Sequence, residues 1–364
     1  MNFRETIIVN LKDRSYEIII EEGLVEHWCR EIKAVTKAER VFVIVDENVL
    51  GLHGERFRAT LEASGLRWEI IPFRAEERYK NLETVSFLYD QLTEKKAHRH
   101  EPLVAVGGGI VGDVAGFVAA TYQRGVPLIQ FPTTLLAQVD SSIGGKVGID
   151  HREGKNLIGS FYQPRVVLID PGLLDTLPRR EFLNGLAEVI KYGFIADPEI
   201  LDFLLTEDGL KKGLSGQKRI RLIARCAGIK AAVVSQDERE AGYRMILNYG
   251  HTTGHAIEKV TGYSAVSHGQ AVAVGMIVAA EMAHHLGKLN RDDVELHRRV
   301  IAGAGLPIKL PQVEISALLE AMLLDKKYGT SNRFVLLEEV GRPVVVEGVP
   351  EEIVVKSLLA TQEE

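Results

Sequence analysis

Three histidines within eighteen residues form the group whose types and spacing most directly suggest metal chemistry. His251 and His255 are four positions apart, so both imidazoles would face one side of a helix, and His268 stands at an expected helix start. An anionic ligand is also expected, and Glu188 in an apolar segment is the best candidate, with an ion pair to Lys191 as the alternative explanation. Because the glutamate of HExxH is missing, the pattern argues against a zinc peptidase.

A glycine triplet that follows a short apolar run is the second candidate site. Leu103–Val106 reads as a buried strand, and Gly107–Gly109 then lead into a helix that contains Asp113. Such glycines let the backbone approach a ligand closely, while helix N-terminal amides point at an anion such as a pyrophosphate. The triplet fits GxGxxG, but glycines needed only for a tight turn explain it equally well, because no acidic residue ends a strand about twenty positions later. Asp46 follows an earlier strand and is a candidate for binding a ribose hydroxyl. The alternative is that Asp46 is simply a solvated residue of a loop.

A glycine-rich segment further on combines basic, acidic and amide side chains. It comprises Gln138–Asp150 and Gly154–Gly159 and holds Asp140, Lys146, Lys155 and Asn156. Ammonium groups suit phosphate, and carboxylate and amide groups suit hydroxyls, so this expected loop fits a phosphorylated, polyhydroxylated substrate. The GxxxxGK[ST] pattern fails at Asp140 and Val147, which excludes a loop for nucleotide triphosphates. A solvated loop is the alternative.

Short apolar runs alternate with helical stretches through the first half of the chain. They predict a mostly parallel, Rossmann-like α/β sheet covered on both faces, which would bind ligands where its strands end. The expected elements are a hairpin of Glu5–Asn10 and Tyr16–Ile20, strands at Val41–Val45, Trp68–Ile71, Leu103–Val106, Leu128–Phe131 and Val166–Ile169, and a helix over Leu82–Lys96.

Helical patterns dominate after Pro171–Gly172. A length of 364 residues favours two domains, and we expect an α/β domain over 1–172 and a mainly α-helical domain over 173–364. The expected helices are Arg180–Tyr192, Gln217–Val234, Met245–Thr261, Gly269–His285, Val294–Ala304 and Ile315–Leu324, followed by a hairpin of Arg333–Leu337 and Val344–Glu347 and a helix from Glu351.

Composition excludes several classes of protein. A net charge of −6 argues against bulk attraction to nucleic acid or anionic membranes. Cys29 and Cys226 lie far apart without CxxC spacing, which excludes a disulfide scaffold and a cysteine-rich zinc site. The longest uncharged apolar stretch, Ala271–Ala280, is half of the ~20 residues that a spanning helix needs. With no signal-peptide pattern at the start, a cytoplasmic location is expected.

These segments together resemble the 3-dehydroquinate synthase family, the sugar-phosphate cyclases of the shikimate pathway, whose fold is shared with glycerol dehydrogenase-like proteins. The resemblance runs in order along nearly the whole chain. The matching segments are Glu77–Thr84, Gly107–Gly125, Phe131–Lys146, Gly154–Pro164, Ala187–Gly193, Lys230–Glu240, Asn248–Glu258, His268–Gly269 and Asp325–Lys327.

The resemblance implies a zinc ion, replaceable by cobalt, bound by Glu188, His251 and His268, whereas spacing alone pairs His251 with His255. It also implies an NAD-binding first domain, a metal- and substrate-binding second domain, and a homodimer in which Arg124 reaches the phosphate of the neighbouring subunit's substrate. NAD would lie against Asp46, Asn48, Glu77, Lys80, Gly107, Gly108, Gly109, Asp113, Thr133, Thr134, Asp140, Lys146, Lys155 and Thr176. Substrate would be held by Asp140, Lys146, Asn156, Lys191, Lys230, Arg244, Asn248, His255 and either Lys326 or Lys327.

The implied reaction converts 3-deoxy-D-arabino-heptulosonate 7-phosphate to 3-dehydroquinate and phosphate. It consists of transient oxidation by NAD, β-elimination of phosphate, re-reduction, ring opening and an intramolecular aldol step. Tyr249, Thr253 and Gln270 depart from the family's usual Leu or Trp, Phe and Glu, which leaves the substrate preference open.

Three alternatives to this reaction remain at this stage. One is another sugar-phosphate cyclase, making an aminated quinate or a seven-carbon cyclitol. The second is a glycerol or glycerol-1-phosphate type dehydrogenase, although those typically use Asp where this chain has Glu188. A non-catalytic binding module would require a missing site residue, and none is missing.

Overall fold

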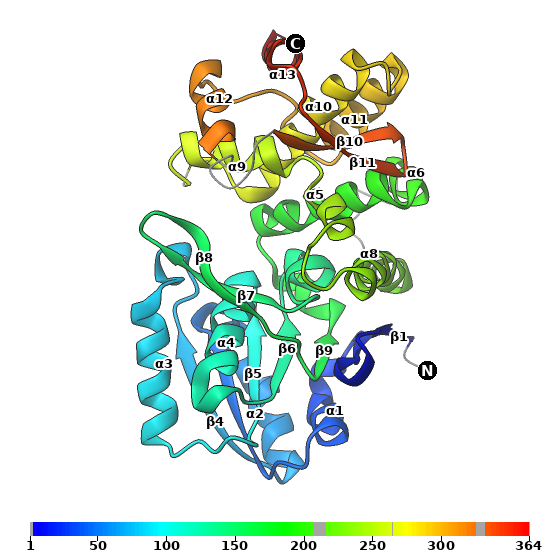
Figure 1. Ribbon diagram of the computed structural model, residues 1–364. Helices are drawn as coiled ribbons and strands as arrows, with labels where there is room; N and C mark the ends of the chain where they lie inside the picture. Colours follow the sequence, from blue (N-terminus) through cyan, green and yellow to red (C-terminus); the bar gives the residue numbers. More distant parts are fainter. Residues whose placement is uncertain (1–2, 207–215, 264, 325–331, 364) are drawn as a thin grey trace. The chain divides into compact units, whose positions relative to one another are not determined.

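The computed structural model describes residues 3–206, 216–263, 265–324 and 332–363 (Figure 1). Contacts divide the chain into two compact units, Met1–Pro178 with Ser215–Arg239, and Arg179–Leu214 with Glu240–Glu364. These units differ from the predicted ranges 1–172 and 173–364 chiefly at helix α8 (Gly216–Gln236), which packs in the first unit against β1 (Arg4–Val9). Helical periodicity shows that α8 has an apolar face but not which unit receives that face.

The first unit is built on a seven-stranded sheet with the order β1-β2-β9-β6-β5-β3-β4. β1 and β2 pair antiparallel, and the remaining neighbours pair parallel. The mostly parallel sheet and its predicted strands are therefore confirmed. The strands after β1 are β2 (Tyr16–Glu21), β3 (Arg40–Asp46), β4 (Arg67–Phe73), β5 (Leu103–Gly107), β6 (Leu128–Pro132) and β9 (Val166–Ile169).

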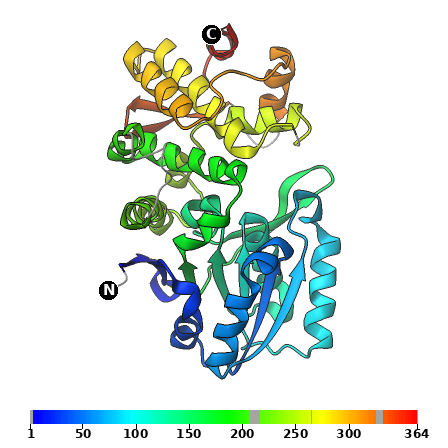
Figure 2. The same ribbon diagram turned by 180° about the vertical axis from the view of Figure 1, so that it is seen from behind.

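Helices cover both faces of this sheet (Figure 2). On one face, Trp28 of α1 (Trp28–Val35) and Phe57 of α2 (Glu47–Ser64) meet Phe131 of the sheet edge to face, with ring centroids 5.5 to 5.6 Å apart. The other face is covered by α3 (Leu82–Glu94) and α4 (Gly109–Thr121). Apolar strands buried on both sides explain why the sheet reads as continuous hydrophobic runs.

The strand order contains a switch point beside the glycine triplet. β4 lies on one side of β3 and β5 on the other, so the direction of winding reverses between β3 and β5. Ligands of open α/β sheets bind outside the carboxyl ends of the strands at such a point. Because Val45 pairs with Val106, the next residues, Asp46 and Gly107, end neighbouring strands there.

The glycine-rich segment that was expected to be a loop is regular structure instead. It forms a π-helix, η5 (Ala137–Ser141), and then a hairpin of β7 (Lys146–His151) and β8 (Gly154–Phe161). A Cβ on Gly148 or Gly159 would lie 2.6 to 2.7 Å from a carbonyl oxygen of the opposite strand. These glycines therefore permit close strand pairing, which the loop interpretation missed.

The second unit is mainly helical, as predicted, and packs around α10 (His268–His285), which is buried over Ala271–Ala280. The predicted single helix over Met245–Thr261 is wrong, because Gly250 adopts a φ of 79° and breaks it. No helix among the described residues is both long and apolar enough to cross a membrane. The other elements are α5 (Arg179–Ile195), α6 (Pro198–Leu205), η7 (Tyr243–Asn248), α9 (His251–Val260), α11 (Arg291–Gly303), α12 (Ile315–Leu324), β10 (Arg333–Glu339), β11 (Arg342–Glu347) and α13 (Glu351–Glu363).

Asp170, directly after the end of β9, joins separate segments of the first unit through hydrogen bonds. Its fully buried carboxylate accepts backbone hydrogen bonds from Gly23 and Val25 at 3.0 Å and from Gly172 at 2.9 Å. We expect Asp170→Ala to destabilise the first unit by about 3 kcal/mol or more, because three amides lose a charged acceptor.

Urea unfolding followed by tryptophan fluorescence measures this effect, since Trp28 and Trp68 are the only tryptophans and both lie in the first unit. The exposed Asp13 of the same unit supplies the control, and Asp13→Ala should change stability by less than about 0.5 kcal/mol. Equal midpoints for the two variants would contradict the assigned role of Asp170.

Candidate active site

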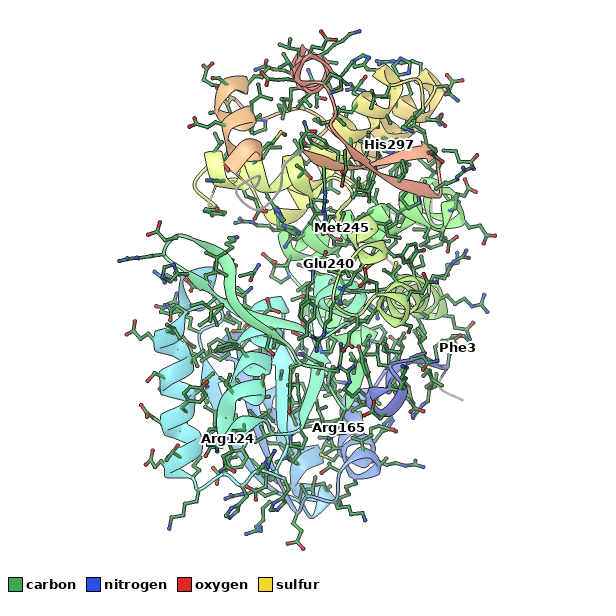
Figure 3. The ribbon with its side chains drawn as sticks, in the orientation of Figure 1. Phe3, Arg124, Arg165, Glu240, Met245 and His297 are labelled. Atoms are coloured by element: carbon green, nitrogen blue, oxygen red, sulfur yellow. The ribbon has the colours of Figure 1, made fainter. Side chains whose placement is uncertain are left out.

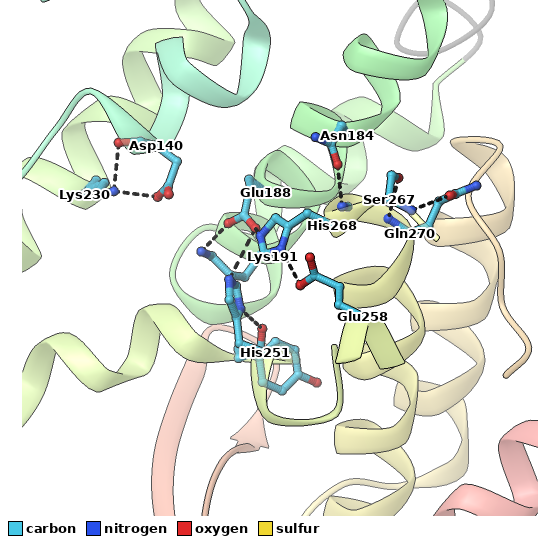
Figure 4. A network of polar contacts seen from close by, with 12 residues as sticks. Asp140, Asn184, Glu188, Lys191, Lys230, His251, Glu258, Ser267, His268 and Gln270 are labelled. Carbon is cyan, nitrogen blue, oxygen red and sulfur yellow. Dashed lines mark hydrogen bonds and ion pairs between the residues drawn. The ribbon is translucent and has the colours of Figure 1, made fainter. Parts of the chain in front are cut away.

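Glu188, His251 and His268 each direct one ligand atom to a common point in the second unit (Figure 4). Oε1 of Glu188 lies 3.6 Å from Nε2 of His251 and 3.6 Å from Nε2 of His268. A tetrahedral zinc ion with bonds of about 2.0 to 2.1 Å holds its ligands about 3.3 Å apart. The three side chains named by the resemblance therefore fit zinc in type and in spacing, and a slight contraction would close the site around the ion.

Local sequence explains how each of these side chains is placed. Glu188 lies on the buried face of α5 and is 1% exposed. His251 is the first residue of α9, directly after the left-handed Gly250. His268 is the first residue of α10, whose start is fixed by a capping box between Ser267 and Gln270. The glutamine that departs from the usual family residue still completes this cap.

Hydrogen bonds behind the two histidines leave their Nε2 atoms facing Glu188. Nδ1 of His251 lies 3.1 Å from the Tyr249 carbonyl oxygen, and Nδ1 of His268 lies 3.1 Å from Oε2 of Glu258. Such partners fix the ring orientation and the tautomer of metal-binding histidines. Sequence reasoning gave no role to Glu258, although it follows His251 by seven positions and so shares a face of α9 with it.

His255 does not join this cluster, in contrast to the pairing that helical spacing suggests. It is exposed on α9, and its ring centroid lies 5.5 Å from that of His251. Together with Glu258 and His268 it forms a second group of potential ligands. That group contains the exposed His255, whereas the first is built on the deeply buried Glu188, so the set around Glu188 is the better metal site.

Positive charge gathers around the Glu188 carboxylate. The ammonium of Lys191, 1% exposed, contacts Oε2 of Glu188. Burial lowers the pKa of His268, but its hydrogen bonds to Glu188 and Glu258 outweigh this effect and raise the pKa to about 10. Burial lowers the pKa of His251 to about 3, against the attraction of Glu188. The carboxylate thus attracts cations, while His251 keeps the neutral form that a metal requires.

In the first unit, the glycine triplet lies closely packed between the end of β5 and the start of α4. A Cβ on Gly108 would lie 3.0 Å from the Thr134 side chain, and one on Gly109 would lie 3.0 Å from Oγ of Ser141. The Thr133 amide donates to the Gly107 carbonyl at 2.9 Å. Because the first amides of a helix have no partner within the helix, this cradle suits an anion such as a pyrophosphate.

A polar cluster lies on the side of α4 that faces the β7–β8 hairpin. The buried Lys80 donates to Oδ2 of Asp113 and to Oδ1 of Asn156, both at 2.5 Å. Burial opposes the charge on Lys80, but Asp113 more than compensates, and the pKa of Lys80 is raised. Lys155 pairs with Glu77 at 3.0 Å. The structure therefore brings Asn156, which the resemblance gives to the substrate, among expected NAD-binding residues.

Two other expected cofactor residues of the first unit, Asp46 and Thr176, make hydrogen bonds within that unit. Asp46 caps α2 by accepting from the Asn48 amide at 3.0 Å. Thr176 lies 2.8 Å from the His53 ring through its hydroxyl group.

Asp140 and Lys230 form an ion pair within the first unit. Nζ of Lys230 donates to the carbonyl oxygen and to Oδ1 of Asp140, both at 2.8 Å. The π-helix η5 places both oxygens on the same side of the chain. Lys146 lies nearby in sequence, exposed at the start of β7.

The remaining expected substrate residues of the second unit are Arg244, Asn248 and His255. Arg244 is 2% exposed in η7, and Asn248 donates to Glu240 at 2.9 Å. Lys326 and Lys327 lie outside the described residues.

Arg124 lies away from the cofactor residues of its own chain. Arg124 is exposed and follows the C-terminal end of α4 (Figure 3). The glycine triplet lies at the N-terminal end of this 13-residue helix, about 20 Å away along the helix axis. The φ of 64° at Arg124 and the φ of 48° at Gln123 are left-handed values that non-glycine residues adopt at a cost. This turn carries Arg124 at the end of α4 opposite the glycine triplet, to which the resemblance assigns NAD.

Comparison with known proteins places the chain in a family of enzymes. Residues 70–184 match the family model described as 3-dehydroquinate synthase N-terminal, and residues 185–328 match 3-dehydroquinate synthase C-terminal. The 3-dehydroquinate synthase of Nostoc punctiforme is 44% identical over 96% of this chain and 97% of its own length. That of Pelobacter propionicus is 45% identical over 96% of this chain and 98% of its own length.

Solved structures support the same fold. A 2-epi-5-epi-valiolone synthase from Streptomyces hygroscopicus, solved with NAD+ and Zn2+ bound, is 27% identical and gives a TM-score of 0.88 over 97% of this chain and 98% of its own. A 2-deoxy-scyllo-inosose synthase, complexed with carbaglucose-6-phosphate, NAD+ and Co2+, is 28% identical with a TM-score of 0.85 over 98% and 100%. A probable glycerol dehydrogenase from Sinorhizobium meliloti, 18% identical with a TM-score of 0.66 over 94% and 95%, shares the fold alone.

The two family matches together cover residues 70–328 and so include parts of both units. Sequence identity above 40% over nearly the full length, together with the assembled Glu188, His251 and His268, leads to one conclusion. The chain belongs to the 3-dehydroquinate synthase family.

Proposed function

We propose that this chain converts 3-deoxy-D-arabino-heptulosonate 7-phosphate to 3-dehydroquinate and phosphate, with NAD and zinc as cofactors. The observation that carries the proposal is the cluster of the buried Glu188 with the half-buried His251 and His268 in a chain of this family. One carboxylate and two imidazoles are the ligands of a catalytic zinc site that keeps a coordination position open. As is usual for such ligands, Nδ1 of each imidazole has a hydrogen-bond partner on the side away from the metal.

The two cofactors supply the chemistry that side chains lack. Bound zinc would lower the pKa of a substrate alcohol and polarise the carbonyl formed from it. Bound NAD would take up a hydride and return it within each turnover. Because the cofactor is regenerated, the expected product is an isomerised, dephosphorylated ring and not a reduced nucleotide.

The protein groups would bind, orient and neutralise charge. In the first unit, the amides of Gly108 and Gly109 would receive the pyrophosphate, and Asp46 a ribose hydroxyl, at the switch point between β3 and β5. In the second unit, the ammonium of Lys191 and the guanidinium of Arg244, both buried, would stabilise an anionic substrate. These groups favour a phosphorylated acid as substrate.

The decisive measurement is phosphate release together with the absorbance of NADH. With zinc, NAD and the heptulosonate phosphate, we expect phosphate to be released in many turnovers per NAD while NADH does not accumulate. Stoichiometric NADH formation with glycerol or glycerol 1-phosphate would instead identify a net dehydrogenase and overturn the proposal. Faster release of phosphate from a different phosphorylated sugar would identify another cyclase of the same chemistry.

We also propose a cytoplasmic homodimer in which Arg124 acts on the substrate of the neighbouring subunit. The support is the exposed, strained position of Arg124 at the end of α4 opposite the glycine triplet. At that distance its own side chain, which extends about 7 Å, cannot reach the region where its own subunit would hold NAD.

A further inference from the structure

Behind the metal site, a buried tyrosine and a buried histidine form a hydrogen bond that the proposed reaction does not use. Oη of Tyr249 lies 2.9 Å from Nε2 of His297, which is on α11 and fully buried (Figure 3). Tyr249 is also fully buried, and it is one of the residues that depart from the usual family pattern. The two residues are 48 positions apart, so only the fold of the second unit brings them together.

The geometry fixes the direction of this hydrogen bond. Nδ1 of His297 lies 2.7 Å from the Asp293 carbonyl oxygen, which can only accept, so Nδ1 carries the proton. The neutral ring then has an acceptor at Nε2, and the Tyr249 hydroxyl donates to it at 2.9 Å in preference to the Met276 carbonyl oxygen, which lies 3.4 Å away. Burial lowers the pKa of His297 to about 4, which keeps the ring neutral at physiological pH.

Tyr249 is linked in turn to the proposed metal ligand His251. Its carbonyl oxygen lies 3.1 Å from Nδ1 of His251. The turn that follows Tyr249 is held against α10, because a Cβ on Gly250 would lie 2.8 Å from the Met276 amide nitrogen. Rotation of the Tyr249 peptide would therefore move the acceptor that orients the His251 ring.

His297 also contacts the helix that carries Glu188. Its ring stacks on Phe194 of α5 with a centroid distance of 3.6 Å and an interplanar angle of 6°. One imidazole thus touches α5 directly and, through Tyr249, the start of α9. These two helices supply the glutamate and one histidine of the metal site.

We propose that the Tyr249–His297 hydrogen bond is a positioning element of the metal site, which holds the Tyr249 carbonyl where it fixes the tautomer and orientation of His251. This inference rests on the proposed function, because it takes His251 as a zinc ligand. Outer partners of metal ligands change metal affinity by about 10 to 100-fold when removed, and the lower value is expected here because Tyr249 acts through one further bond.

The test is the zinc affinity of the full chain, measured by competition with a chromophoric chelator. We expect Tyr249→Phe and His297→Leu each to weaken zinc binding about tenfold, and the double variant to bind zinc no more weakly than the weaker single variant. His297→Gln, which retains an acceptor for the tyrosine hydroxyl, should restore part of the affinity lost in His297→Leu. The visible spectrum of the Co2+-loaded protein should change in Tyr249→Phe, because the orientation of one ligand changes.

Thr361→Val supplies a matched control, since Thr361 of α13 is fully buried in the same unit and donates to the Ser357 carbonyl at 2.9 Å. It should lower stability without changing zinc affinity. The inference is overturned if Tyr249→Phe loses stability as Thr361→Val does and still binds zinc as tightly as the natural chain. If the natural chain itself binds no zinc, the proposed metal site fails, and this inference fails with it.

Discussion

Glu188→Gln is expected to abolish zinc binding and to lower kcat by about 10³-fold or more. The substitution keeps the size of the side chain but removes the anionic oxygen that lies 3.6 Å from both imidazoles. A zinc ion contributes several kcal/mol of transition-state stabilisation, and each 1.36 kcal/mol corresponds to a factor of ten in rate. Two neutral imidazoles alone would hold the ion too weakly for turnover.

Elemental analysis after dialysis and phosphate release measure the two effects. Glu281→Gln is the matched control, because Glu281 is also fully buried in the second unit and is paired with Arg291 and Arg298 at 2.9 to 3.1 Å. Both variants should lose stability, since each leaves a buried cation without its carboxylate, Lys191 in the first and Arg298 in the second. Only Glu188→Gln should lose zinc, and stoichiometric zinc in that variant would refute the ligand assignment.

Lys191→Met is expected to have the opposite effect on metal binding. The Lys191 ammonium contacts the carboxylate that would bind zinc and repels a second cation at the same place. Its removal should leave zinc affinity unchanged or raise it, while kcat falls about 10² to 10³-fold, because the buried positive charge that would stabilise the anionic substrate is lost. Metal content and activity thus respond in different directions.

The same chelator competition and phosphate assay distinguish these two roles of Lys191. Lys259→Met, at an exposed lysine on α9, should leave both quantities unchanged. Loss of zinc in Lys191→Met would show that the lysine supports the ligand set instead of the substrate. Unchanged turnover with retained zinc would remove Lys191 from the proposed catalytic groups.

The sequence predicts the sheet well because its strands are buried on both faces. Runs such as Val41–Val45 and Leu103–Val106 are uniformly apolar, short and followed by polar or glycine residues, so their type and approximate ends can be read directly. Helix α2 was missed. Its apolar face has few large residues, and Gly51 and Gly54 interrupt it, so its stability comes from packing of Phe57 that no local pattern reveals.

Two predictions from helical periodicity, the pairing of His251 with His255 and the single helix over Met245–Thr261, differ from the structure for the same physical reason. Helical spacing groups His251 with His255, but the cluster forms from His268, which reaches it from the start of another helix. Gly250 breaks the expected helix just before His251, and only packing against α10 requires that break. The resemblance names three residues that the fold brings together, whereas periodicity describes only neighbours along one helix.

Partners of the ligands are the least predictable part of the site. Glu258 could be found from its place on the same face of α9 as His251. The Tyr249–His297 pair could not, because a hydrogen bond between residues 48 positions apart depends on how α11 packs against the remainder of the unit. Such distant pairs leave no periodic signal in a single sequence.

The interleaving of the two compact units has a consequence for how the protein is made. The chain passes between the units three times, at residues 178, 214 and 239, so neither unit is a continuous stretch. A ribosome that has released the first 178 residues has produced a sheet whose β1 still lacks its covering helix α8. At about 5 to 20 residues per second, Glu188 waits roughly 4 to 16 seconds for His268, which follows 80 positions later. Lys191, the partner of Glu188 in the complete chain, is made only three residues after it. Because the units alternate along the chain, no single cut in the gene yields two complete units.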